Sequence, residues 1–178
     1  MEERLPNNEG AGGLSLSALV ERSRRMNPDR IIVGEVIGAE IIAMLDAMSQ
    51  GEDGSLSTIH ARDSRMVFQR IASYALTSPA RLPVEAAGML TAGALDFVVH
   101  MTKTRLPDGR IHRHVSSVRE VLGFDGNQVI SAEVFTCSPG QLLATAAAPI
   151  SEVRTARLAA EGYDPRPGGR RGLTLAGR

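Results

Sequence analysis

The sequence has few aromatic residues, one cysteine and one lysine. Aromatic residues make up 3% of the 178 residues and tryptophan is absent, which argues against a surface on which nucleic-acid bases stack. Cys137 cannot form a disulfide within the chain and suits a reducing compartment. The formal net charge is zero, so no overall field attracts nucleic acid or an anionic membrane. We therefore expect no nucleic-acid partner.

Long apolar runs are also absent. The two most apolar windows, residues 41–48 and 86–99, are interrupted by Asp46 and Asp96, and neither reaches the roughly 20 apolar residues of a membrane-spanning helix. The first ten residues, MEERLPNNEG, are acidic and polar, unlike a secretory signal. We therefore expect a cytoplasmic protein that reaches a membrane only through partners.

The phosphate-binding P-loop pattern, GxxxxGK[ST], is missing as well. Its lysine would have to be Lys103, because the chain has no other. Lys103 lies in the strand-like stretch HMTKTR, with no glycine before it. The sequence therefore contains no P-loop.

Helical and strand-like patterns alternate along the first half of the chain. Capping residues, apolar spacing and breakers predict helices over residues 15–26, 39–50, 63–76 and 84–94. RIIVGE and SLSTI, which lie between the first three of these helices, predict short strands. Because strands that alternate with helices are usually parallel, we expect a parallel sheet with crossover helices.

The pattern changes after residue 96. FVVHM, IHRHVSSVREVL and QVISAEVF predict a meander of three antiparallel strands, joined by turns at PDG and DGN, which extends the parallel sheet. We expect residues 1–143 to form the folded domain. Residues 144–178 are rich in Ala, Gly and Arg, and predict a tail with a short helix at 151–161 followed by disorder.

Two chemically competent side chains follow the two predicted parallel strands. Glu35 ends RIIVGE and His60 follows SLSTI, and ligands of open α/β sheets bind at the carboxyl ends of such strands. A carboxylate there can deprotonate a water, and a histidine can bond a phosphate oxygen. The spacing equally allows a solvated Glu35 on a loop and a His60 bonded to a nearby carbonyl.

Three further histidines offer a metal-binding alternative. His112 and His114 are two residues apart in one predicted strand, and His100 lies in its neighbour. Three histidines on paired strands can ligate zinc. However, Arg110 and Arg113 add positive charge and no acidic residue or cysteine has a metal-like spacing, so a solvated strand face is the simpler interpretation.

The stretch LVERSRRMNPDRIIVGEVIGAEIIAMLDAMSQGEDGSLSTIHA closely resembles the traffic ATPases of type II and type IV secretion, and most of all the CpaF/TadA group of tight-adherence pili. DRIIVGEV resembles the Walker B segment of this family and GSLSTIHA its His box. The resemblance extends from about residue 2 to residue 136. It implies an incomplete RecA-like P-loop NTPase core, with Walker B and His-box strands and crossover helices, plus the antiparallel β meander.

The resemblance also implies roles for individual residues. Glu35 matches the Walker B glutamate that activates the attacking water, and His60 matches the His-box histidine that faces the γ-phosphate. The nucleotide-binding matches are Gly34, Thr58, Asp29 and Arg4. Ile37 departs from the family, in which many members carry arginine after GEV.

The family implies ATP and Mg²⁺ as cofactors, a homo-hexamer, and an inner-membrane platform protein as partner. Family members carry the P-loop before the segment that Met1 begins, beside the His-box strand in the sheet. Because that strand is missing here, we expect a gap or an exposed sheet edge, weak ATP binding and no hydrolysis by the chain alone. A second hypothesis is a non-catalytic truncated paralogue that acts as an interaction module for an ATPase or a platform protein.

Overall fold

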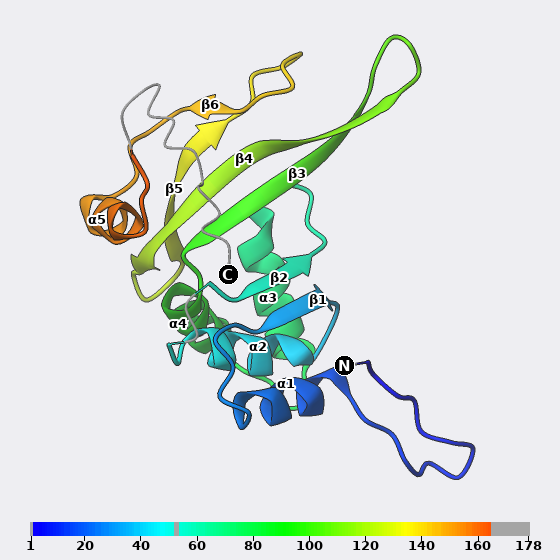
Figure 1. The fold of residues 1–178 in the computed structure, drawn as a ribbon. Coiled ribbons are helices and arrows are strands. Elements are labelled where there is room, and N and C mark those ends of the chain that lie inside the picture. Colours follow the sequence, from blue (N-terminus) through cyan, green and yellow to red (C-terminus); the bar gives the residue numbers. More distant parts are fainter. Residues whose placement is uncertain (1, 52–53, 165–178) are drawn as a thin grey trace, which may run out of the picture.

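The computed structural model describes residues 2–51 and 54–164. Its helices and strands follow the predicted order, with one short strand, β6, that was not expected (Figure 1). In chain order they are α1 (Leu16–Arg24), β1 (Ile32–Val36), α2 (Glu40–Met48), β2 (Leu56–Ile59), α3 (Met66–Thr77), α4 (Val84–Ala94), β3 (Phe97–Arg105), β4 (Ile111–Phe124), β5 (Val129–Thr136), β6 (Thr145–Ala146) and α5 (Glu152–Ala160).

The strands form two sheets rather than the single extended sheet predicted from the sequence. β1 and β2 pair in parallel, and β3, β4, β5 and β6 form an antiparallel sheet in that order. Within the described residues, one edge of β2 and one edge of β3 therefore have no neighbouring strand. The exposed sheet edge that was expected as an alternative to a gap is therefore present at both strands.

Local side-chain bonds set where the helices begin. The hydroxyl of Ser15 accepts a hydrogen bond from the amide of Ala18 at the start of α1, as the predicted N-cap requires. The carboxylate of Asp63 accepts bonds from the amides of Arg65 and Met66, at 2.9 and 2.8 Å, and so caps α3. Asp63 was one of the two residues predicted to start this helix.

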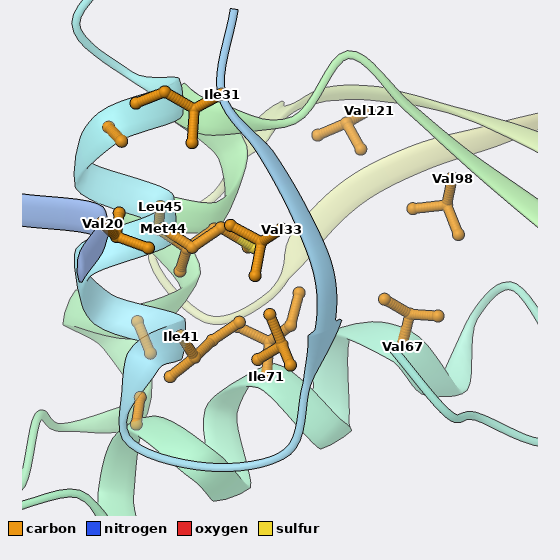
Figure 2. Packing of buried hydrophobic residues seen from close by; sticks show 14 residues of the cluster. Val20, Ile31, Val33, Ile41, Met44, Leu45, Val67, Ile71, Val98 and Val121 are labelled. Carbon is orange, nitrogen blue, oxygen red and sulfur yellow. The ribbon is translucent and has the colours of Figure 1, made fainter. Parts of the chain in front are cut away.

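A single apolar core joins the helices to both sheets (Figure 2). Ile41 and Leu45 of α2 are completely buried beneath β1, whose Val33 and Val36 face them. Val98 of β3 and Val121 of β4 belong to the same cluster. Helix α4 packs on β4 so closely at Gly88 that an added Cβ would lie 2.5 Å from a ring carbon of Phe124.

Buried polar contacts attach helix α5 to β4. The side chain of Glu120 is 1% exposed, and its two oxygens accept bonds from the amide of Ser151 (2.9 Å) and from its hydroxyl (2.5 Å). The guanidinium of Arg154 forms an ion pair with Asp96, donates to the carbonyl of Val121 and lies over the Phe97 ring. The predicted short helix therefore exists and is docked on the sheet. The disorder predicted after it falls in residues 165–178, outside the described residues.

Candidate active site

An irregularity in β1 turns Glu35 toward solvent. The register pairs Val33 with Ser57 and Val36 with Ile59. Between these two pairs, β1 advances by three residues while β2 advances by two, so β1 contains one extra residue. Strict alternation would put Glu35 on the same face as buried Val33. The extra residue lets Val33 and Val36 both face the core, while Glu35 is left outside. A bulge commonly re-aims a side chain beside a functional site.

His60 follows β2 on the same outward face. The alternation predicted from the sequence is present: Leu56, Thr58 and His60 are exposed, whereas Ser57 and Ile59 are partly buried. The structure brings His60 to Glu35, with 2.8 Å between His60 Nε2 and Glu35 Oε1. Their side chains are 89% and 48% exposed, so both remain accessible to a ligand.

The backbone around this pair is fastened by polar contacts between the two strands. The hydroxyl of Thr58 donates to the carbonyl of Gly34 at 2.5 Å, directly beside Glu35. At the opposite end of the two strands, just before each begins, the Ser55 hydroxyl accepts a hydrogen bond from the amide of Ile31 at 2.9 Å. A Cβ added to Gly34 would meet no atom within 4 Å, so space beside this residue is open to an approaching group.

The other two predicted site residues lie apart from the pair. Asp29 precedes β1, so it is at the opposite end of that strand from Glu35. Arg4 belongs to a hairpin at residues 2–14, where its Nε donates to the carbonyl of Gly12 at 2.6 Å. Neither residue contacts Glu35 or His60.

Two residues that sequence reasoning did not assign to the site hold the loops beside it. Glu40 is 8% exposed, and its carboxylate accepts bonds from the amides of Ile37 (2.5 Å) and Gly38 (2.9 Å). It thereby fixes the turn that follows Glu35. A glutamate in the first turn of a predicted helix is the signal that could have found it.

Asp63 plays the corresponding part after His60. The amide of Met66, and then that of Arg65, bond its carboxylate and lower its pKa, with smaller contributions from the charges of His100 and Arg119. The Arg119 side chain is buried and its Nε donates to the Ser64 hydroxyl at 3.3 Å. The loop after His60 is therefore tied to the antiparallel sheet.

A groove of about 770 Å³ lies between β2 and β3. Its walls come mainly from residues 54–61 and 94–101, and they include His60. The Ser57 hydroxyl lines this groove and is buried without a hydrogen-bond partner. A second hollow, of about 840 Å³ between α1, α2 and residues 78–82, contains none of the predicted site residues.

The site offers groups that suit the phosphates of a nucleotide but shows, among the described residues, no cluster of ligands for the accompanying Mg²⁺ ion. Glu35 and His60 offer a carboxylate and an imidazole to a water or a phosphate oxygen. Mg²⁺ prefers several oxygen ligands, yet no group of three or more His, Cys, Asp or Glu residues within 2–51 and 54–164 is arranged to hold a metal ion.

The same search bears on the histidines of β3 and β4. The His112 and His114 rings stack at 5.6 Å between centroids, and His100 Nδ1 lies 2.9 Å from the Ser116 hydroxyl. His112 is exposed, but His114 is only 9% exposed and its Nδ1 is buried without a hydrogen-bond partner among the described residues, so the expectation of a solvated strand face is wrong for His114. As to membranes, none of the helices in the described part of the chain is long and apolar enough to cross a bilayer.

The fold and the paired side chains define an α/β protein with a polar site at the ends of two parallel strands. Comparison with known sequences then gives the family: the chain belongs to the type II/IV secretion system proteins, whose family model matches residues 4–126. The recognition made from the sequence is thus confirmed at the level of the family.

Individual relatives agree with this assignment. The chain is 36% identical over 102 residues to a putative conjugal transfer protein of Mycobacterium tuberculosis, covering 57% of this chain and 28% of the relative. It is 32% identical over 95 residues to protein VirB11 of Agrobacterium fabrum, covering 52% and 28%. The chain therefore spans less than a third of the length of these relatives.

A solved structure supports the same conclusion about the fold. The crystal structure of the VirB11 ATPase from the Brucella suis type IV secretion system, in complex with sulphate, matches with a TM-score of 0.53 and 30% sequence identity. The match covers 59% of this chain and 31% of the VirB11 chain. The mixed α/β fold of this chain is therefore similar to that of a secretion ATPase.

Proposed function

We propose that this chain is the C-terminal part of a hexameric ATPase that couples ATP hydrolysis to protein secretion or pilus assembly, of the CpaF/TadA group. The observation that carries the proposal is the 2.8 Å contact between Glu35 and His60 at neighbouring strand ends, in a chain of the secretion family. In the complete protein, ATP and Mg²⁺ are the cofactors. The assembly works at the inner face of the membrane against a platform protein.

In this proposal Glu35 takes a proton from the attacking water. Its carboxylate is an anionic proton acceptor at the strand ends, and the bulge in β1 holds it clear of the core. His60 Nε2–H donates to Glu35 and orients the carboxylate, and the ring is exposed enough to reach a γ-phosphate oxygen. Thr58 and Gly34 keep β1 and β2 aligned so that the two side chains stay together.

The groove between β2 and β3 is the proposed place of the missing P-loop strand. Both walls are strands with an open edge, and a strand between them would offer partners to those edges. The unpartnered Ser57 hydroxyl would also gain access to a backbone group. The cradle for the phosphates and the binding of Mg²⁺ are then assigned to the inserted part, because this sequence contains no P-loop.

The test has two arms. The chain alone should show no Mg-ATP turnover above background. Measurable turnover that Glu35→Gln abolishes would contradict the proposal that hydrolysis also needs the part with the P-loop. If the DNA on the 5′ side of the Met1 codon encodes a P-loop, the longer product should hydrolyse ATP. There, Glu35→Gln should lower kcat by about 10² to 10⁴, whereas Glu152→Gln on α5 should leave it unchanged.

The second candidate function is a non-catalytic interaction module. The open edges of β2 and β3 favour it if no P-loop is encoded nearby, because the same groove would then take a strand from a separate ATPase subunit. A pull-down with a P-loop-containing subunit of the same organism distinguishes the interaction module from the ATPase fragment. The native chain is compared with the Leu56→Lys variant, which changes a residue that lines the groove. Binding that Leu56→Lys abolishes supports the module.

A further inference from the structure

Two hairpins project from opposite ends of the molecule and carry opposite charge (Figure 1). One is the distal part of β3 and β4, residues 99–115, with four basic residues and one acidic residue. The other is the hairpin at residues 2–14, with three glutamates and one arginine. Since the whole chain has a net charge of zero, this separation of charge is a local property of the two hairpins.

The basic hairpin gathers its charges on one face. Directly opposed residues of antiparallel strands share a face, and the register pairs Lys103 with Arg113 and Arg105 with Ile111. Val99 and Met101 continue this face along β3 and are more than half exposed. We call the set Val99, Met101, Lys103, Arg105, Ile111 and Arg113 the basic face.

The basic face carries a cost that folding does not offset. Like charges directly opposite each other destabilise a strand pair, and Lys103 and Arg113 have no acidic partner within the described part of the chain. One lysine on an edge strand is a common device against aggregation. The facing arginine adds repulsion beyond that purpose, which indicates an acidic partner.

The hairpin at residues 2–14 has the complementary surface. Backbone bonds between Arg4 and Leu14 hold its two arms together, and the Asn7 side chain accepts from the amides of Glu9 and Ala11. Glu2, Glu3 and Glu9 are exposed, and so is Leu5, at 80%. We use the term acidic face for the exposed surface of this hairpin, which carries these four residues and offers carboxylates to the basic face.

We infer that the basic face of one copy of this chain docks on the acidic face of a second copy. The two hairpins of one molecule lie too far apart to meet, so the contact is between molecules. Because the two surfaces differ, the contact is head-to-tail, which builds a ring or a filament rather than a closed pair. This inference deepens the proposed homo-oligomer but does not depend on ATP hydrolysis, so an inactive chain would still show it.

The single lysine makes the contact easy to map. A zero-length carbodiimide joins an amine to a carboxylate, and Lys103 is the only lysine side chain. In a mixture of ¹⁴N- and ¹⁵N-labelled chains, mass spectrometry should find Lys103 joined to Glu2, Glu3 or Glu9 of the other isotope. Lys103→Arg keeps the charge, so it should lose the cross-link and retain self-association.

Charge reversal tests the energetics. Sedimentation velocity should show self-association at about 0.01 M salt, where the Debye length is about 30 Å, and its loss at about 1 M, where it is about 3 Å. Lys103→Glu with Arg113→Glu, or Glu2→Lys with Glu3→Lys, should each weaken self-association at least about tenfold. Arg22→Glu with Arg25→Glu on α1 makes the same charge change elsewhere and should not.

A mixture of the two reversed variants distinguishes head-to-tail docking from general charge effects. Each variant alone then presents two faces of the same sign and should be monomeric, whereas the mixture should associate because opposite faces meet again. Circular dichroism verifies that each variant is folded. A native chain that is monomeric at low salt, a cross-link from Lys103 to other carboxylates, or binding to phosphatidylserine vesicles without self-association would overturn the inference.

Discussion

The two sheets of this protein are supported in different ways. The parallel pair β1 and β2 is short, and its inner face rests on α2 through Val33 and Val36. Its outer face is bare: Ile32 and Leu56 are 71% and 62% exposed. The antiparallel sheet has longer strands and buried polar contacts to the loop before α3 and to the N-cap of α5.

This difference separates the part of the fold that has more stabilising contacts from the part that carries the candidate site. The four-stranded sheet adds buried polar contacts with α5 and close packing against α4 to its share of the common core. The strand pair that carries Glu35 and His60 depends on one helix beneath it and leaves edge and face open. Sites that must receive a ligand or a partner are commonly drawn from such weakly supported parts of a fold.

The largest expected effect comes from removing the support under the parallel pair. Leu45 is completely buried in α2, so Leu45→Ala should lower the free energy of unfolding by about 3 kcal/mol. Hydrogen exchange should rise first in β1 and β2. Leu143→Ala, at a position that is 76% exposed, is the matched control. Equal loss of protection in β3, β4 and β5 would show that the two sheets are not supported differently.

A second substitution probes the antiparallel side. Glu120→Gln keeps the size of the side chain but removes the charge that faces Ser151 and Arg154, and charged hydrogen bonds contribute roughly 1.5–3 kcal/mol. We expect a loss of about 2 kcal/mol in urea unfolding, with faster exchange confined to α5 and its contacts. Glu152→Gln, on the exposed side of α5, should cost far less. Faster exchange in β1 or β2 would mean that the regions are coupled.

The sequence predicted the local elements well because each has a local cause. Apolar spacing and the capping residues Ser15 and Asp63 determine where helices begin, and the PDG and DGN turns determine the meander. The pairing of Glu35 with His60 was also within reach, because parallel strands place their carboxyl ends at one edge.

What the sequence did not predict depends on distant contacts. The bulge that exposes Glu35 breaks the two-residue period, so periodicity alone would have buried that side chain beside Val33. Arg119 and Glu120 resemble a solvated strand face, and only the fold brings Ser64, Glu133 and Ser151 to them. The division into two sheets also follows from which strand is available to pair, which no local pattern records.

The smallest expected effect compares the same device in both regions. Asp63 beside the site and Asp125 in the turn between β4 and β5 both have a pKa below the ordinary value, because backbone amides bond each carboxylate. For Asp63 the bond from Met66 is the largest cause, followed on the lowering side by that from Arg65. For Asp125 the bonds from Gln128 and Asn127 come first.

A pKa that is lower in the folded state than in the unfolded state stabilises the fold above the unfolded pKa of about 3.9, and this stabilisation is lost as pH falls through the folded pKa. Asp63→Asn should therefore cost up to about 1 kcal/mol at pH 7, reduced by solvent screening, and almost nothing at pH 2. Urea unfolding at both pH values measures the difference. Because Arg119 and His100 add to the effect at Asp63, Asp63→Asn should lose more of its cost in high salt than Asp125→Asn does. Equal salt dependence would show that the charges of Arg119 and His100 on the antiparallel sheet do not stabilise the Asp63 carboxylate in the loop after His60.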